Sequence, residues 1–218
     1  MCLVEIGLAM AEKSPDVVWH SGSVGPDERR KVTKNSPAVV WLTGLSGCGK
    51  STIAMTLELA LIRSGHPAFV LDGDNLRHGL NSDLGFSAQD RTENIRRVSE
   101  VARLFADAHI IAICSFISPY RLDRRNARNR IEPHAFLEVF VDAPLNICEQ
   151  RDPKQLYRKA REKLAAGTPM GFTGIDAPYE PPENPEVHVK TDVQTVDQCV
   201  ESILQTLRTR RILLQGDA

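Results

Sequence analysis

The residues from Gly44 to Ser51 read GLSGCGKS and fit the pattern G-x-x-x-x-G-K-[ST] of a phosphate-binding loop. Small residues let successive backbone N–H groups turn toward phosphate oxygens, and the following helix adds its partial positive charge. Lys50 is expected to reach the β- and γ-phosphates, and Ser51 to coordinate Mg²⁺. A chance match in a glycine-rich turn is disfavoured by the strand predicted before the loop and the helix predicted after it. The pattern predicts ATP binding without naming the acceptor.

Two carboxylates, Asp72 and Asp74, follow a second short apolar run. Such a pair is either a capped turn or, beside a phosphate loop, a group that orients or deprotonates an acceptor hydroxyl and holds the water shell of a metal. Asp74 is the better candidate, because Asp72 directly follows the strand and is expected to be structural. No Asp ends the third strand, which argues against a large motor ATPase and favours a small kinase.

Further along, aromatic and basic residues recur near these sites. Arg91 and Asn94, three residues apart, would share a helical face and converge on one anion. Phe86 is either a core residue or a ring-binding one. Phe172, in the glycine-flanked Gly171–Asp176 loop, is either a packed loop aromatic or a clamp on a flat ring.

Two runs of basic residues have different interpretations. The first is interpreted as a solvated helix face rather than a second anion site; it comprises Arg121, Arg124, Arg125, Arg128 and Arg130. The second follows the fourth strand, where small kinases carry a closing lid, and this favours a functional role; it comprises Arg151, Lys154, Arg158, Lys159, Arg161 and Lys163.

The elements that must position these residues alternate along the chain. Short apolar runs predict strands at Ala38–Leu42, Ala68–Leu71, Ile110–Cys114, Leu137–Val141 and Val187–Val189. Helices are expected at Ser51–Arg63, Asn94–Ala106 and Val196–Arg208. Alternation of strands and helices predicts a mostly parallel sheet covered on both faces, with ligands beyond the carboxyl ends of the strands.

The fold class is therefore α/β: a P-loop NTPase-type three-layer domain with a mostly parallel five-stranded sheet and a mobile lid. Residues 1–36, rich in glycine, serine, proline and charge, are expected to be an N-terminal extension, with Met10 as an alternative start. Residues 37–218 form the P-loop kinase domain, and its lid spans about residues 145–176. The total of 218 residues suits one such domain.

The overall composition excludes several classes. A net charge of −1 gives the chain no electrostatic attraction to nucleic acid or an anionic membrane, so local arginines and lysines must hold any anionic substrate. The five dispersed cysteines indicate a reducing cytosol. No histidine spacing suggests a metal other than Mg²⁺. No secretory signal or membrane span is recognised, so a cytoplasmic location is expected.

Taken together, these motifs resemble one family closely, adenylyl-sulfate kinase (APS kinase) of the stand-alone bacterial kind. The resemblance covers nearly the whole chain and is most specific at Asp72–Asn75 and Phe172–Asp176. The matching segments are Trp41–Ser51, Leu71–Leu80, Asp83–Phe86, Glu93–Arg97, Ser115–Tyr120, Phe140–Pro144, Cys148–Asp152 and Gly171–Asp176.

The resemblance implies transfer of the ATP γ-phosphoryl to the 3′-hydroxyl of adenosine 5′-phosphosulfate, which yields 3′-phosphoadenylyl sulfate (PAPS) and ADP in sulfate assimilation. It implies catalytic roles for Lys50 and Asp74, and the family has a serine, here Ser118, described as a phosphorylated intermediate. Direct transfer is favoured, because a cradled γ-phosphate and an aligned hydroxyl need no covalent relay.

The same resemblance assigns the binding residues. Those expected to bind ATP are Gly44, Gly47, Cys48, Gly49, Lys50, Ser51, Thr52, Arg151 and Gln194. Those expected to bind the acceptor are Asp74, Asn75, Leu76, Arg77, Phe86, Arg91, Asn94, Ile117, Ser118, Lys154, Gly171 and Phe172, with Phe86 and Phe172 enclosing the adenine. Mg²⁺ is expected on Ser51 directly and on Asp74 through water. A homodimer and a functional partnership with sulfate adenylyltransferase are also implied.

Two departures from the family pattern stand near the clamp. Met170 replaces the usual Lys or Arg, and the segment Lys163–Met170 looks longer than usual. Both are expected to change substrate affinity or substrate inhibition while the chemistry stays. The alternatives are another small P-loop kinase, which would not need the Asp72–Arg77 and Phe172–Asp176 runs, and a catalytically silent nucleotide-binding regulatory module. A silent module would have no need of Lys50, Ser51 and Asp74 together.

Overall fold

A computed structural model describes residues 16–18, 20 and 22–214. The strands are β1 (Ala38–Thr43), β2 (Ala68–Asp72), β3 (Ile111–Ser115), β4 (Ala135–Asp142) and β5 (Val187–Lys190). The helices are α1 (Pro26–Thr33), α2 (Lys50–Arg63), α3 (Gly73–Leu76), α4 (Ala88–Asp107), α5 (Arg121–Ile131), α6 (Leu145–Arg151), α7 (Leu156–Ala165) and α8 (Val196–Thr209). Met10 lies outside the described residues.

The five strands form one sheet in the order β2-β3-β1-β4-β5, and every pairing is parallel. Strand β1 lies at the centre, where Val40 is in register with Ile113 of β3 and Leu137 of β4. The chain order reverses at β1, so the loop after it opens into the crevice where such sheets bind ligands. The predicted five-stranded sheet is confirmed.

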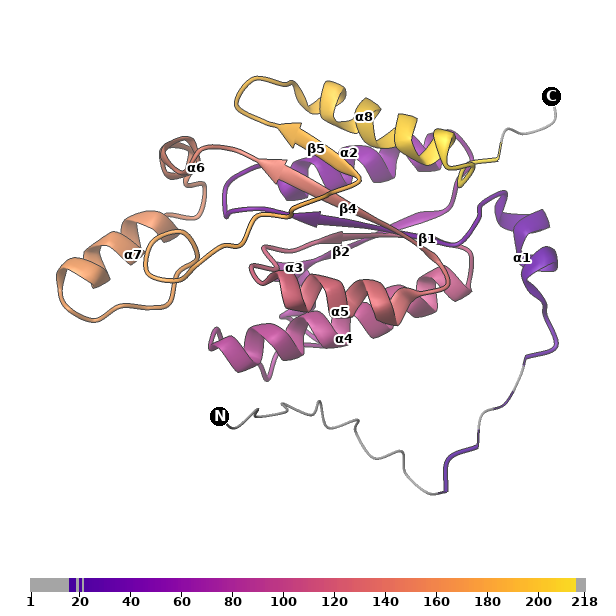
Figure 1. Ribbon diagram of the computed structural model, residues 1–218, viewed down its shortest axis with the longest axis horizontal. Helices are drawn as coiled ribbons and strands as arrows, with labels where there is room; N and C mark the ends of the chain where they lie inside the picture. Colours follow the sequence, from indigo (N-terminus) through magenta and orange to yellow (C-terminus); the bar gives the residue numbers. More distant parts are fainter. Residues whose placement is uncertain (1–15, 19, 21, 215–218) are drawn as a thin grey trace, which may run out of the picture.

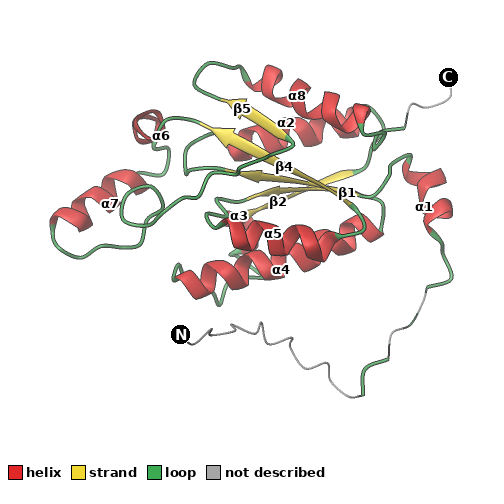
Figure 2. Cartoon of the chain, viewed as in Figure 1, coloured by secondary structure: helices red, strands yellow, loops and turns green. Residues whose placement is uncertain are grey.

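Helices cover both faces of the sheet and make the expected three layers (Figures 1 and 2). All of β1 is buried, and its alternate residues face opposite layers. Val40 and Leu42 pack in the cluster that includes α2 and α8, whereas Val39 and Trp41 pack with α4 and α5. This two-sided burial explains the continuous apolar run of β1.

The site-bearing helix α4 begins at Ala88, six residues before the predicted start at Asn94. Ser87 caps it: its hydroxyl accepts from the Asp90 backbone N–H at 3.1 Å and donates to the Asp90 carboxylate at 2.8 Å. This N-cap satisfies a backbone donor that the helix itself leaves unpaired. The earlier start places Arg91 inside the helix, on one face with Asn94, as their spacing predicted.

The extension contains the short helix α1, which the sequence did not predict. Pro26 occupies its first turn, and Glu28 accepts from the Gly25 backbone N–H at 2.7 Å. Asn35, two residues after the helix, is fully buried against the turn before β2, where it donates to the Pro67 carbonyl at 3.0 Å. The packed domain thus includes Asn35, within the segment assigned to the extension.

The interpretation of the first basic run as a solvated face is wrong for Arg124 on α5. Its buried guanidinium donates to Glu138 at 2.6 Å and to the carbonyls of Ser118 at 2.6 Å and Glu180 at 2.7 Å. Arg128, one turn later, forms two 2.8 Å hydrogen bonds to Glu186. These arginines hold the segment before β5 against the sheet.

Within the described residues, no helix is both long and apolar enough to cross a membrane.

Candidate active site

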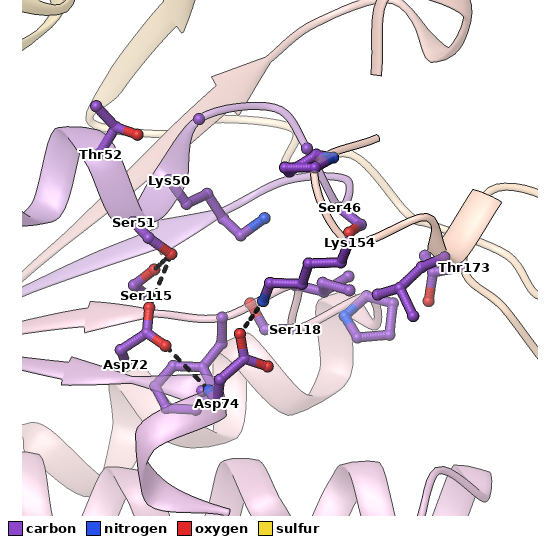
Figure 3. Close-up of a pocket in the computed structure, with 18 of the residues that line it drawn as sticks. Ser46, Lys50, Ser51, Thr52, Asp72, Asp74, Ser115, Ser118, Lys154 and Thr173 are labelled. Atoms are coloured by element: carbon purple, nitrogen blue, oxygen red, sulfur yellow. Dashed lines mark hydrogen bonds and ion pairs between the residues drawn. The ribbon is translucent and has the colours of Figure 1, made fainter. Parts of the chain in front are cut away.

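A cleft of about 830 Å³ lies beyond the carboxyl ends of the strands. Its walls come from the loop after β1, the exits of β2 and β3, the first turns of α4, and the segment that carries α6 and α7 (Figures 1 and 3). The strand exits named from the sequence therefore converge on one cavity.

The phosphate loop wraps tightly at the end of β1. A side chain at Gly44 would place its Cβ 2.2 Å from the Val141 carbonyl oxygen, so only glycine fits there. Gly49 has φ +100°, a conformation that glycine adopts without strain. The Lys50 ammonium lies in the loop, where it donates to the carbonyls of Gly44 at 3.0 Å and Leu45 at 2.7 Å.

Ser51, the first residue after that lysine, points toward the exits of β2 and β3 (Figure 3). Its hydroxyl donates to Asp72 Oδ2 at 2.8 Å and lies 3.4 Å from Ser115 Oγ. The other oxygen of Asp72 accepts from the Asp74 backbone N–H at 3.0 Å. Asp72 therefore both caps the turn, as expected, and lies nearer to Ser51 than the sequence reasoning assumed.

These oxygens fit a hard cation. Hydroxyl and carboxylate groups are ligands that Mg²⁺ uses, usually together with water and substrate phosphates. In the part of the chain that the structure describes, no group of three or more His, Cys, Asp or Glu side chains could hold a metal by itself. The donor set thus suits an ion that arrives with its nucleotide.

Asp74 and Lys154 meet across the mouth of the cleft (Figure 3). The Lys154 ammonium, from the segment between α6 and α7, forms an ion pair with Asp74 Oδ2. Both side chains are more than half exposed, so water screens the pair and its contribution to stability is small. The contact brings a cation of the second basic run to the carboxylate at the exit of β2.

Another part of the cleft lining combines a cation with an aromatic ring. The Arg77 guanidinium lies over the Phe86 ring at 4.2 Å from its centroid. Phe86 is 66% exposed and lines the cleft, so its interpretation as a core residue is wrong. Burial lowers the pKa of Arg77, an effect that Asp74 opposes, and the group stays cationic because its ordinary pKa is so high.

Phe172 also lines the cleft and is only 8% exposed. Its ring meets Tyr157 edge-on at 4.9 Å, and the Tyr157 hydroxyl donates to the Ser46 carbonyl at 2.9 Å. Burial raises the pKa of Tyr157, which keeps this donor protonated. Phe172 is thus both a packed loop aromatic and part of the cleft wall.

Arg91 connects α4 to the loop that carries Phe172. Its guanidinium donates to the Gly171 carbonyl, the Thr173 hydroxyl and, at 3.0 Å, the Phe86 carbonyl. Within the loop, Asp176 accepts from the backbone N–H groups of Gly171 and Phe172. Burial acts to raise the pKa of Asp176, but these hydrogen bonds outweigh it and hold that pKa below its usual value.

At the exit of β3, Ser118 is buried with its backbone at φ +39°. Its hydroxyl accepts from Trp41 Nε1 at 3.1 Å, and its carbonyl accepts from Arg124. The neighbouring Ile117 carbonyl accepts from Thr43 Oγ1 at 2.7 Å. Hydrogen bonds from strand β1 and helix α5 thus fix this turn at the edge of the cleft.

Thr191, at the exit of β5, was missed in the sequence reasoning. Its hydroxyl donates to the Cys48 carbonyl at 2.8 Å and accepts from Arg151 at 3.0 Å. Arg151 also donates to the Thr191 carbonyl at 2.6 Å, while Gln194 accepts from the Lys190 N–H at 2.5 Å. The signal was its position directly after the fifth strand, since the exits of β1, β2 and β3 also supply residues that line the cleft.

Most residues expected in the site line this one cleft: Gly47, Gly49, Lys50, Ser51, Thr52, Asp74, Arg77, Phe86, Arg91, Asn94, Ile117, Ser118, Arg151, Lys154, Gly171, Phe172 and Gln194. Four expected residues do not line it: Gly44, Cys48, Asn75 and Leu76. Cys48 is fully buried behind the loop, with its sulfur 3.7 Å from the Lys50 ammonium. Its side chain therefore packs inside the protein beneath the phosphate loop and does not face the cleft.

Known proteins are similar to this chain in both sequence and fold. Residues 36–190 match the family described as adenylylsulphate kinase. An adenylyl-sulfate kinase of Clostridium acetobutylicum is 53% identical over 202 residues, covering 93% of this chain and 98% of that relative. One of Marinobacter nauticus is 52% identical over 198 residues, covering 91% and 98%.

A solved structure of Mycobacterium tuberculosis APS kinase in complex with AMPPNP and APS is 47% identical, with a TM-score of 0.75. The match covers 80% of this chain and 99% of that one. The chain therefore belongs to the adenylyl-sulfate kinase family.

Proposed function

We propose that this chain transfers the γ-phosphoryl group of ATP to the 3′-hydroxyl of adenosine 5′-phosphosulfate, forming PAPS and ADP. The observation that carries the proposal is the meeting, in one cleft, of a phosphate loop with Asp74 and with a wall of aromatic and cationic side chains. Two relatives named adenylyl-sulfate kinase are 53% and 52% identical to this chain over 98% of their own length.

On the nucleotide side, the loop N–H groups and Lys50 hold the phosphates of ATP, with Thr52, Arg151 and Gln194 nearby. Ser51 and the carboxylate of Asp72 would hold Mg²⁺, with Asp74 reaching its water shell. When bound, the ion neutralises charge that develops on the transferring phosphoryl group.

On the acceptor side, Phe86 and Phe172 enclose the adenine, since two aromatic faces suit a flat base. The phosphosulfate and ribose are bound by side chains at the end of α3, on α4 and in the lid, and by the backbone at three further positions. The side chains are those of Arg77, Arg91, Asn94 and Lys154, and the backbone positions are Ile117, Ser118 and Gly171. Asn75 and Leu76, which do not line the cleft, support the turn that presents Asp74.

In the transfer itself, Asp74 orients the 3′-hydroxyl and accepts its proton. The 3′-oxygen forms a bond to the γ-phosphorus while the bond from that phosphorus to the β–γ bridging oxygen breaks, and ADP leaves with that oxygen. Lys154 forms an ion pair with Asp74, so the carboxylate that accepts the proton has a cation beside it.

Direct transfer accounts for the role of Ser118 better than a phosphoserine intermediate. The Ser118 hydroxyl is buried and accepts a hydrogen bond from Trp41. Phosphorylation would add bulk and about two negative charges at that point. We assign Ser118 to shaping the turn beside the acceptor.

The segment from about residue 145 to residue 176, with α6 and α7, is proposed as a lid that closes over both substrates. It stands out beyond the carboxyl ends of the strands (Figure 1) and supplies Lys154 and Phe172. Met170 lines the cleft in this lid, where a cation is usual in the family, so weaker acceptor affinity is expected.

We also propose that the chain works in the reducing cytoplasm as a homodimer, supplied with its acceptor by sulfate adenylyltransferase. Met55, Leu59 and Ile62 give α2 an exposed apolar stripe that a second copy would cover. The four cysteines among the described residues are buried free thiols, which agrees with a reducing compartment.

The test is incubation with Mg-ATP and adenosine 5′-phosphosulfate, with chromatography of the nucleotides. Equal amounts of PAPS and ADP are expected, and no product with adenosine or gluconate as acceptor. ADP formation with gluconate but not with adenosine 5′-phosphosulfate would replace the proposal by another small-kinase activity. ATP binding without any transfer would favour a silent module.

A further inference from the structure

Asn81 lies between α3 and α4 and does not line the cleft. Asn81 is fully buried, and its backbone N–H donates to the Leu76 carbonyl at 2.9 Å. Its side-chain Nδ2 donates to Oδ1 of Asn94 at 2.8 Å. A buried amide outside the site thus contacts an amide that lines it.

This contact decides which end of Asn94 a ligand meets. Asn94 is 7% exposed and lines the cleft. An asparagine side chain carries an acceptor and a donor group, and either can face a ligand. Because Oδ1 of Asn94 already accepts from Asn81, its NH₂ group is the end available to a ligand.

The arrangement leaves a buried acceptor without a partner. Oδ1 of Asn81 is the one buried side-chain nitrogen or oxygen, among the described residues, that has no hydrogen-bond partner. Such an atom lowers the stability of the folded state, and native proteins contain few of them. Leucine, whose side chain has the same branching and the same number of heavy atoms, would leave no unpaired oxygen there. Packing therefore does not explain an amide here, whereas the orientation of Asn94 does.

The turn that carries Asn81 is fixed to the helix that carries Asn94. Arg97, one turn further along α4, donates to the Leu80 carbonyl at 3.0 Å and forms an ion pair with Asp83 at 2.6 Å. These bonds flank Asn81 on both sides in the sequence. They hold the two amides at hydrogen-bonding distance.

We propose that Asn81 is a positioning residue that directs the NH₂ group of Asn94 into the cleft, so that Asn94 meets the acceptor substrate only as a hydrogen-bond donor. Arg91, on the same face of α4, also offers only donors. This wall therefore selects a group rich in acceptor oxygens, such as the ribose or phosphate oxygens of a nucleotide. Naming that nucleotide as adenosine 5′-phosphosulfate rests on the proposed function, but the direction of the Asn94 amide does not.

The kinetic test is Asn81→Leu, with Ser82→Ala as the matched control at the exposed neighbour. Asn81→Leu is expected to raise the KM for adenosine 5′-phosphosulfate about tenfold, the value of one hydrogen bond to a charged group. The KM for ATP and kcat should stay within about twofold, because Asn81 does not line the cleft. The thermal midpoint should change little, because the unpaired oxygen of Asn81 is removed while Oδ1 of Asn94 loses its donor. An unchanged KM for the acceptor, or a rise in both KM values with a lower midpoint, would overturn the proposal.

A double-mutant cycle locates the effect. If Asn81 acts through Asn94, then adding Asn81→Leu to Asn94→Ala should change the acceptor KM no further. The same fold-increase in both backgrounds would show that Asn81 acts by another route, which contradicts the proposal.

The amide direction can be read on the wild-type protein without catalysis. NMR should detect a scalar coupling across the hydrogen bond, from ¹⁵Nδ2 of Asn81 to ¹³Cγ of Asn94. A coupling in the opposite direction, from Asn94 nitrogen to Asn81 carbon, would overturn the proposal. If the wild type forms no PAPS, the proposed function fails, while this coupling still decides the role of Asn81.

Discussion

The hydroxyl of Ser51 donates a 2.8 Å hydrogen bond to Oδ2 of Asp72, which joins the end of the phosphate loop to the exit of β2. Strand β3 lies between β1 and β2, so this contact passes over the end of β3, where Ser115 Oγ lies 3.4 Å from the Ser51 hydroxyl. The carboxylate nearest to the expected metal-binding hydroxyl is therefore Asp72, and Asp74 is free to meet Lys154.

Replacing Asp72 by Asn is expected to impair the use of Mg²⁺. The amide keeps an oxygen for the Asp74 N–H but loses the negative charge, so the fold should survive. Turnover should fall about 100-fold, equivalent to about 2.7 kcal/mol of transition-state stabilisation. The Mg²⁺ concentration for half-maximal rate should rise, and steady-state titration measures both. An unchanged Mg²⁺ dependence would remove Asp72 from the metal site.

Asp74→Ala should lose turnover by a factor of about 100 to 10,000, the usual contribution of general base catalysis. ATP affinity, measured by calorimetry, should stay within about twofold, because Asp74 lies across the cleft from the phosphate loop. Glu149→Ala serves as a control, because it removes a carboxylate of α6 that does not line the cleft. Turnover near the wild-type rate would exclude Asp74 from the chemistry.

The two aromatics are predicted to differ in stability although both bind the base. Stacking on a base contributes about 1–3 kcal/mol, so Phe86→Ala and Phe172→Ala should each raise the acceptor KM by about 5- to 150-fold. Phe172→Ala should also lower the free energy of unfolding by about 3 kcal/mol, because that ring is buried. Phe86→Ala should leave it nearly unchanged. Urea unfolding distinguishes them, and equal destabilisation by both would contradict the assigned burial.

The strands and the loop could be predicted because they depend on local patterns. Apolar runs such as Ala38–Leu42 and the glycine spacing of the phosphate loop are read directly from the chain. Phe86 and Arg124 could not be placed, since the exposure of Phe86 depends on the cleft that it lines and the burial of Arg124 depends on partners far along the chain. The Glu180 carbonyl that accepts from Arg124 is 56 residues away.

The roles of the two aspartates show the same limit within one motif. Asp72 and Asp74 are two residues apart, and both precede or begin a short helix. Their partners are Ser51 and Lys154, which lie on different sides of the cleft. The position of Asp72 and Asp74 after a strand indicated that both are functional. Which side chain each carboxylate contacts could not be predicted, because it depends on the order of the strands in the sheet and on where the lid places Lys154.

A pH dependence is predicted from His66, whose ring donates to the buried Asn35 side chain at 2.7 Å. Burial lowers the pKa of His66 from its ordinary value of 6.5, and the charge of Lys34 lowers it further. Below pH 6.5 the unfolded chain binds a proton at His66 more readily than the folded chain does. The free energy of unfolding is therefore highest above about pH 6.5 and decreases as the pH falls below that value. His66→Gln should flatten this part of a stability-versus-pH curve from urea unfolding. An identical slope in both proteins would contradict the assignment.

The central claim is that the phosphoryl group reaches the 3′-oxygen of adenosine 5′-phosphosulfate. The most direct measurement is phosphorus NMR of the product made from Mg-ATP and this acceptor, with the 3′-deoxy acceptor as its matched control. The account predicts one new phosphomonoester, coupled to the proton on the 3′-carbon, and no transfer to the 3′-deoxy compound. A phosphomonoester at any other position, or equal transfer to the 3′-deoxy compound, would contradict it.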